Sequence, residues 1–386
     1  GSSSSTDSTS TTDTTTVTPT STTVPVTKGP LLMATAVDSS SPVKTGIQID
    51  GTNKYTFTGD ITYPITVTGG YVDVNDNGVV DVGVVDVGDY EFTGKLTSYS
   101  TVVTPITTYL GDTSKDAGKA KLAALKTLAG ITSDDDLLAK DPSETNEDVL
   151  ALVASIYQSY PSLMDNDNSN DANTEGNQDL TTKFADYKSV ISQGTFEGET
   201  VKQKLIRVEQ QLRDTSGVDA LSEFDIEKMN LSKEDFVGKK LVVENETYYF
   251  RENDVVLADS GEDYTKILSY DSIENGSVKV KFENGDYDLI TLTESGFDIS
   301  YYENGSLSET ESVTNQLTSY TDTELTQVLA DIPFTLTTAM LDNKVIYFND
   351  SDGFTSLTFG AYDSSFTSGS FYEYTHDTGE SPTTCH

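Results

Sequence analysis

The chain has few basic residues, one cysteine, two histidines and no tryptophan. Its 24 Lys and Arg stand against 63 Asp and Glu, which gives a formal net charge of −39 and a pI near 4.1. Nucleic acids and anionic membrane surfaces would repel such a chain, so neither is expected as a partner. Cations are the partners that this composition favours.

The low cysteine content excludes a disulfide within the chain, because Cys385 has no second cysteine to pair with. A low cysteine content is common in proteins of the bacterial exterior and also in cytosolic proteins, so it does not decide the compartment. No run approaches eighteen apolar residues, so we expect no transmembrane helix, and no signal peptide remains at the start. Either a signal was removed or none was present, and the opening stretch favours removal.

Few residues are suited to catalysis. Cys385 and His386 are adjacent, whereas a nucleophile and its base usually come from separate segments, and His376 is best interpreted as a surface residue. No HExxH, glycine-rich phosphate loop or CxxC motif occurs. We therefore predict that the protein is not an enzyme, although a carboxylate pair for glycoside hydrolysis stays open in so acidic a chain.

Residues 1–29 are mostly Ser and Thr and have no hydrophobic period. They cannot bury enough surface to offset the entropy of ordering, which predicts a flexible tether. The start "GSSS" is similar to the region after the lipidated cysteine of bacterial lipoproteins, with the cysteine just before Gly1, and it also fits an expression-tag remnant. The stretch "TTTVTPTSTTVPVT" would alternatively add as a strand to the sheet edge of a second molecule, giving a homopolymer.

Residues 30–112 alternate apolar and polar side chains, with Gly and Pro between the segments. Val, Ile, Thr and Tyr are frequent, which predicts a small β-sandwich. The segments "GPLLMATAVD", "YPITVTGGYVDVNDNGVVD" and "VVTPITTYLGD" resemble a module near the start of large bacterial surface lipoproteins and adhesins. The resemblance covers about a quarter of the chain, and it implies residence at the cell surface rather than an activity.

An acidic loop, residues 73–89, lies inside this module and reads "DVNDNGVVDVGVVDVGD". Calcium loops of the EF-hand type place oxygen ligands at positions one, three, five, seven and nine, and a glycine at six. The matching residues are Asp73, Asn75, Asn77, the Val79 carbonyl and Asp81, with Gly78 at position six. These residues predict a dockerin-like or adhesin-type Ca²⁺ site.

The twelfth position of the acidic loop departs from that pattern. Val84 stands where a bidentate carboxylate is required, so the closing ligand would be Asp86, Asp89 or Glu91. This favours a loop between strands over one between helices. The alternative is a solvated hairpin in which "NDNG" makes the turn; crowding of the aspartates argues against it, because a divalent cation would relieve their repulsion.

The middle of the chain, residues 113–233, has apolar residues at helical spacing. It predicts a bundle of five or six short amphipathic helices. Ser114 is the candidate cap of the first helix, and Gly130 is its expected left-handed stop.

A second acidic segment lies between two of these helices, where residues 165–179 read "DNDNSNDANTEGNQD". A polar loop is the preferred interpretation, because Asn170 and Gly176 break the EF-hand pattern. A second cation site is the alternative.

The last third of the chain returns to strands. Asn-Gly pairs at residues 275, 284 and 304 lie between alternating segments, which predicts a meander of hairpins over residues 234–335. "FVGKKLVVENETYYF" and "MLDNKVIYFNDSDGFTSLTF" resemble each other, so residues 336–386 are interpreted as an incomplete second copy of a lipocalin-like half-barrel unit. We therefore expect the natural protein to continue, or to have been cleaved, beyond His386.

These patterns together predict a multidomain α+β protein. Its expected parts are the tether, the β-sandwich, the helical bundle and the two antiparallel β segments. The leading function is an exported structural or adhesive cell-surface protein stabilised by calcium and able to assemble into a filament. A glycan-binding lipoprotein using some of the 21 tyrosines is the alternative, weakened by the absence of tryptophan, and an extracellular hydrolase is third.

Overall fold

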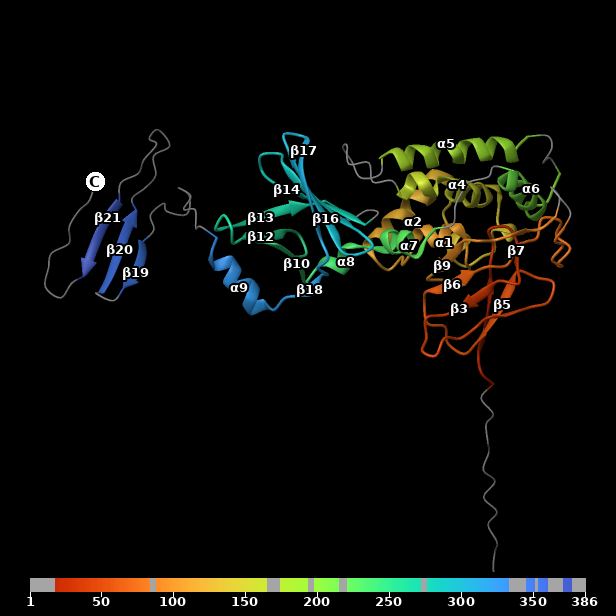
Figure 1. Cartoon of the computed structure of the whole chain (residues 1–386), viewed down its shortest axis with the longest axis horizontal. Coiled ribbons are helices and arrows are strands. Elements are labelled where there is room, and N and C mark those ends of the chain that lie inside the picture. The colour runs from red at the N-terminus through yellow and green to blue at the C-terminus, as the bar shows by residue number, and fades with distance from the viewer. Residues whose placement is uncertain are drawn as a thin grey trace, which may run out of the picture. The chain divides into compact units, whose positions relative to one another are not determined.

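The computed structural model describes residues 18–83, 88–164, 174–193, 198–214, 221–271, 276–332, 345–350, 353–359 and 371–376. The chain mixes helices with antiparallel sheets, as expected of the α+β class (Figure 1). It divides into two compact units, residues 1–261 with 267–320 and residues 262–266 with 321–386. Among the described residues, none of the helices has the length and apolar character needed to cross a bilayer.

The N-terminal β region, residues 18–104, consists of short strands around one core. Three small sheets have the strand orders β1-β5-β4, β3-β6-β9 and β2-β7-β8. Their strands are β1 (Ser21–Pro25), β2 (Leu31–Leu32), β3 (Thr35–Val37), β4 (Ile47–Gln48), β5 (Lys54–Thr58), β6 (Ile65–Thr68), β7 (Tyr71–Val72), β8 (Tyr90–Glu91) and β9 (Lys95–Ser98). Alternate side chains of β5 and β6, such as Tyr55, Phe57, Ile65 and Val67, fill the common core, as their period of two requires.

Part of the predicted tether belongs to this folded region. Strand β1 pairs antiparallel with β5, with Thr23 opposite Thr56. Val24 and Val26 are fully buried in the core. The predicted boundary at residue 29 therefore falls inside the folded region, because Val24 pairs with β5 through β1 and Val26 is bridged to Val103. Residues 1–17 of the predicted tether lie outside the described residues.

Helices occupy most of the chain between residues 105 and 236. They are α1 (Pro105–Leu110), α2 (Asp116–Ala129), α3 (Asp135–Leu138), the 3-10 turn η1 (Pro142–Glu144), α4 (Glu147–Met164), α5 (Thr174–Ile191), α6 (Val201–Asp214), α7 (Glu223–Asn230) and α8 (Lys233–Phe236). Helix α4 contacts α1, α2, α5, α6 and α7 (Figure 1). Its residues 149–156 are buried on every side, so α4 is a central helix rather than an amphipathic one.

The helix ends correct the sequence prediction at two places and confirm it at a third. "TPITTYL" reads as strand but forms α1, because Thr104 and Thr107 make a reciprocal capping box and Pro105 occupies the first turn. Ser114 does not cap α2; Lys115 stands at that position, and the Ser114 hydroxyl donates to Asp112 instead. The left-handed stop at Gly130 is confirmed, with φ 67° and ψ 29°.

A curled antiparallel sheet follows the helices. Its strand order is β17-β16-β15-β14-β13-β12-β11-β10-β18, so seven hairpin connections run in chain order and the last strand returns to the first. The strands are β10 (Lys239–Val243), β11 (Glu246–Phe250), β12 (Val255–Asp259), β13 (Tyr264–Tyr270), β14 (Ser277–Lys281), β15 (Tyr287–Leu292), β16 (Phe297–Glu303), β17 (Ser306–Val313) and β18 (Thr318–Ser319). Asn304 and Gly305 both have positive φ, the requirement of a type I′ hairpin turn.

Residues 321–386 of the second unit contain one helix and three strands among those that the structure describes. They are α9 (Asp322–Ala330), β19 (Val345–Asp350), β20 (Gly353–Phe359) and β21 (Phe371–His376), and the strands form one antiparallel sheet in chain order. A short helix thus precedes this meander, as α8 precedes the curled sheet. That the unit is a second copy of the first meander stays a prediction.

Candidate functional site

The acidic loop connects β7 to β8 in the N-terminal β region. These two strands pair antiparallel, with Tyr71 opposite Glu91 and Val72 opposite Tyr90, so strands flank the loop at both ends. Asp73 directly follows β7, and Asp89 directly precedes β8. The exposed fractions of Asp73 and Asp89 are 2% and 8%, which places two carboxylates out of water at the base of one loop.

The carboxylate of Asp73 organises the first half of the acidic loop. It accepts hydrogen bonds from the backbone N–H of Gly78 at 2.9 Å and of Asn77 at 3.3 Å. The chain can turn this tightly because Gly78 has φ 73°, and a Cβ there would lie 2.6 Å from the Gly51 carbonyl oxygen. The glycine at position six is thus required by both conformation and space.

The carboxylate of Asp89 closes the acidic loop. Its Oδ1 accepts from the Val74 N–H at 3.0 Å and its Oδ2 from the Asp81 N–H at 3.0 Å. The N–H of Asp89 donates in turn to the Asp81 carbonyl at 3.1 Å. Of the three closing residues that the sequence offered, Asp89 is the one bound into the loop; Glu91 lies exposed in β8, and Asp86 lies outside the described residues.

The rim of the acidic loop is built from amides and a carboxylate. The side-chain N–H groups of Asn75 and Asn77 both donate to Oδ2 of Asp81, from Asn75 at 2.8 Å. These hydrogen bonds, first that of Asn75, lower the pKa of Asp81. The Asn77 side-chain oxygen accepts the N–H of Val79 at 2.9 Å. At present the side-chain NH₂ groups of Asn75 and Asn77 point toward Asp81. For their oxygens to bind a cation together with Asp81, each side-chain amide would have to rotate by about 180°, which exchanges the positions of its nitrogen and oxygen.

The electrostatics of the loop base favour a cation. Burial raises the pKa of Asp73, and the negative charge of Asp89 raises it further against the lowering effect of the backbone N–H of Gly78. A divalent ion would stabilise the two charged forms together. Among the described residues, no three His, Cys, Asp or Glu side chains form a metal-binding group by themselves. The predicted calcium ligands are not such a group, because they include the side-chain oxygens of two asparagines and a backbone carbonyl oxygen. Calcium accepts all of these oxygen types as ligands.

Helix α6 supports the acidic loop, a connection that the sequence did not reveal. The Lys202 ammonium lies 2.8 Å from a carboxylate oxygen of Asp76. The Gln210 side-chain amide donates to the Val74 carbonyl at 2.9 Å. Residues about 130 positions apart therefore meet, and no local pattern could have predicted the pairing.

A buried ion pair lies between the N-terminal β region and the same helix. Lys28 and Glu209 are 2% and 0% exposed, and the Lys28 ammonium lies 2.9 Å from a Glu209 oxygen. The Tyr90 hydroxyl donates to that oxygen at 2.7 Å and accepts from Lys28. The ammonium also lies 4.5 Å from the ring centre of Tyr157. The sequence did not indicate this cluster, because Lys28 falls within the predicted tether.

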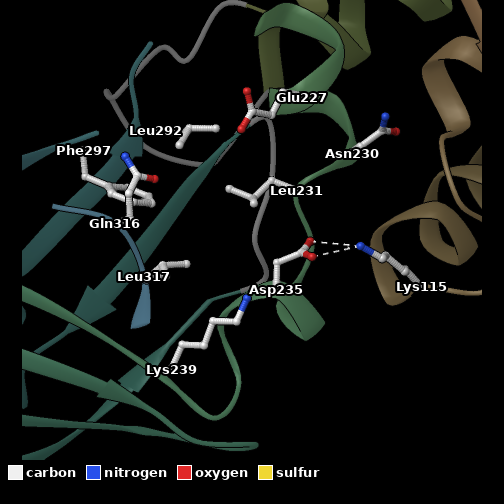
Figure 2. A pocket seen from close by; sticks show the side chains of 10 residues that line it. All are labelled: Lys115, Glu227, Asn230, Leu231, Asp235, Lys239, Leu292, Phe297, Gln316 and Leu317. Carbon is white, nitrogen blue, oxygen red and sulfur yellow. Dashed lines mark hydrogen bonds and ion pairs between the residues drawn. The ribbon is translucent and has the colours of Figure 1, made fainter. Parts of the chain in front are cut away.

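A groove of 440 Å³ lies between the helices and the curled sheet (Figure 2). Lys115 donates to both carboxylate oxygens of Asp235 on one side of it, at 3.0 and 3.2 Å. The remaining lining residues are Glu227, Asn230, Leu231, Lys239, Leu292, Phe297, Gln316 and Leu317. They include neither tyrosine nor histidine, so the groove offers no tyrosine platform for a sugar and no imidazole base.

The remaining candidate residues give little structural information. His376 ends strand β21, with Phe354 opposite it. Cys385 and His386 lie outside the described residues, as do residues 165–173 of the alternative cation site. Glu175 and Gly176 of that segment lie in helix α5 rather than in a loop.

Comparison with known proteins identifies no relative of the chain. No protein-family model, no curated protein and no solved structure matches it.

Proposed function

We propose that the chain is an exported structural or adhesive protein of the cell surface, whose N-terminal β region is stabilised by calcium in the acidic loop. The observation that carries this proposal is the pair of buried carboxylates, Asp73 and Asp89, around which the backbone N–H groups of the loop are arranged. A net charge of −39 adds to it, because such a chain attracts divalent cations. The expected ligands are Asp73, Asn75, Asn77, Val79, Asp81 and Asp89, with Asp86 as a further candidate.

Calcium is expected to raise the stability of the N-terminal β region. Binding to the folded state alone stabilises it by about 1 to 3 kcal/mol when calcium is well above its dissociation constant. The measurement is thermal unfolding in millimolar calcium and in chelator, together with calorimetric titration of calcium. Equal melting curves in the two conditions, with no heat of binding, would contradict the site.

Two variants of the loop distinguish a bound cation from general screening. Asp81→Asn removes a predicted ligand from the exposed rim and should weaken the calcium response. Asp76→Asn is the matched control, because Asp76 lies in the same loop but pairs with Lys202 and is not a predicted ligand. It should retain the response of the wild-type chain.

Assembly through the N-terminal segment is the second part of this proposal. Because Ser21–Pro25 already pairs with β5 of its own chain, the segment that adds to a neighbouring sheet edge must precede Ser21. Strand β17 offers such an edge, since it ends the curled sheet and most of its side chains are exposed. In millimolar calcium, light scattering should show assemblies of the full chain and fewer of a chain lacking residues 1–17. Equal assembly would contradict the homopolymer and leave the lipid-anchored tether.

The glycan-binding alternative has a weaker structural basis. Tyr287 and Tyr302 stack with ring centres 4.5 Å apart, and the Lys279 ammonium lies 4.0 Å from the Tyr287 ring centre. Rings that already stack on each other leave fewer faces for a sugar. A glycan-array signal lost in Tyr302→Ala would favour this alternative over a purely structural role.

A further inference from the structure

The curled sheet holds a carboxylate–tyrosine cluster consisting of Glu246, Tyr248, Asp288, Tyr301 and Glu311. Tyr248 and Glu246 lie two residues apart on β11, so their side chains share one face of the sheet. On β15 and β16, Asp288 lies opposite Tyr301 in the register. Asp288 is 4% exposed and Tyr248 is fully buried, so this part of the cluster is closed to water. Glu246, Tyr301 and Glu311 are half-buried.

Contacts within the cluster join strands that are distant in the sheet. The Tyr248 hydroxyl lies 2.8 Å from Oδ2 of Asp288, although β12, β13 and β14 separate their strands. In a flat sheet, four strand spacings would hold these groups about 19 Å apart. The Tyr301 hydroxyl, one strand further, lies 2.9 Å from Oε2 of Glu246. The cluster therefore ties the two sides of the curl together.

The contacts need more hydrogens than the tyrosines supply. Tyr248 lies within hydrogen-bond distance of Asp288 and also of Glu246, at 3.2 Å. Tyr301 likewise lies near Glu246 and near Glu311, at 3.2 Å. Each hydroxyl has one hydrogen but can also accept one. Four contacts can all be hydrogen bonds only when two carboxyl groups are protonated and donate to the tyrosine oxygens.

The surroundings of the cluster favour the protonated forms of its carboxyl groups. Burial raises the pKa of Asp288 to about 7 against the lowering effect of Tyr248, and the charges of Glu246 and Asp286 add to the rise. Burial also raises the pKa of Glu246, with Asp259 and Glu311 contributing. The tyrosines keep their hydrogens, since burial raises the pKa of both.

The groups facing the cluster are acidic or apolar. Val280 of β14 lies opposite Asp288 in the register, and Asp259 of β12 lies opposite Glu246. One oxygen of Glu311 is buried with no hydrogen-bond partner among the described residues. Besides the five members of the cluster, the charged groups that face it are Asp259, Asp286 and Glu309, which lies opposite Tyr301 in the register.

We propose that the carboxylate–tyrosine cluster is a pH-dependent closure of the curled sheet. At mildly acidic pH, Asp288 takes up a proton from solvent and donates it to Tyr248, which frees the Tyr248 hydrogen for Glu246. As the pH rises, the proton leaves and two carboxylates then compete for one phenol hydrogen. The curl is held tightly on the acidic side and loosens on the alkaline side.

Stability should fall as the pH rises, because the pKa of Asp288 is higher in the folded chain than its ordinary value. Its pKa of about 7 in the folded chain lies above the ordinary value of 3.8, so the folded state binds the proton more tightly than the unfolded state. The stabilisation is present in full below the ordinary value and is lost as the pH rises through about 7. Between pH 5 and pH 8 the unfolding equilibrium constant should rise roughly tenfold to a hundredfold.

The test compares the full wild-type chain with Asp288→Asn between pH 5 and pH 8. Urea unfolding is followed by circular dichroism, and hydrogen–deuterium exchange is read in peptides from β11, β15 and β16. The amide does not titrate but can still donate to Tyr248, so the rise in the unfolding constant should disappear. Asp298→Asn is the matched control, because Asp298 lies on the neighbouring strand and faces the other side of the sheet. The same pH dependence in wild type and Asp288→Asn overturns the proposal.

A second measurement avoids reliance on a variant that fails to fold. In wild-type chain carrying ¹³C-labelled aspartate carboxyls, one resonance should titrate with a midpoint above pH 5.5 while the chain stays folded. Tyr248→Phe removes the hydroxyl that links Asp288 to Glu246, and it should change the midpoint of that resonance. A spectrum in which every aspartate titrates below pH 5 overturns the proposal.

Discussion

Lys28 and Glu209 bring opposite charges into a part of the molecule that water does not reach. Transfer of each charge out of water is costly, and the pair offsets that cost through mutual attraction and the hydroxyl of Tyr90. The adjacent Gly29 leaves the room for this, since a Cβ there would lie 2.7 Å from Cγ of Glu209. Such a pair fixes which face of α6 meets the N-terminal β region, because any other face would leave both charges unpaired.

Removal of one member of this pair should be far more damaging than removal of both. Lys28→Met leaves Glu209 buried and unpaired, and we expect a loss of about 3 to 5 kcal/mol in unfolding free energy. The double variant Lys28→Met with Glu209→Leu should recover most of that loss. Urea unfolding of the single and double variants gives the comparison.

An exposed pair provides the control for this measurement. Lys54 and Glu144 lie 3.4 Å apart with side chains 38% and 60% exposed, so Lys54→Met should cost at most about 1 kcal/mol. If Lys28→Met proves as mild as Lys54→Met, the buried pair does not fix the position of α6.

Strand β1 is the element whose role differs most from the sequence prediction. A deletion of residues 1–25 removes β1 together with the buried Val24, whereas a deletion of residues 1–17 leaves the strand intact. We expect the longer deletion to lower the melting temperature of the N-terminal β region by several degrees, because β5 loses a partner and the core loses a side chain. The shorter deletion should melt like the full chain. Equal melting of the two truncated chains would show that β1 contributes nothing to the core.

Elements with a strong local signal could be predicted from the sequence, and those defined by distant partners could not. The Asn-Gly turn at residue 304 and the left-handed Gly130 follow from conformational preferences of single residues. The spacing of Asp73 and Gly78 likewise located the acidic loop. The sequence left Asp86, Asp89 and Glu91 open as the closing residue. The hydrogen bonds of Asp89 to the Val74 and Asp81 N–H groups, and the support from α6, depend on tertiary contact.

The charge of the whole molecule should make its stability depend on salt. With a net charge of −39, like charges repel one another in the compact state more than in the expanded chain. Raising sodium chloride from 10 to 300 mM shortens the screening distance from about 30 Å to less than 10 Å, so the melting temperature should rise. Differential scanning calorimetry in chelator measures this without the contribution of calcium. A melting temperature that falls with salt would mean that attractive ion pairs outweigh the net repulsion.

The chain-order pairing of the curled sheet has a consequence for how the protein acquires its structure. Each strand from β10 to β17 pairs with its sequence neighbour, so short loop closures suffice for most of the sheet. In the N-terminal β region, β1 must find β5 and β6 must find β9 across about thirty residues. After dilution from denaturant, the meander should therefore gain protection against hydrogen exchange before the N-terminal region does. During synthesis the order of emergence is reversed, and the slower-folding part leaves the ribosome first, which gives it the time that its distant pairings require.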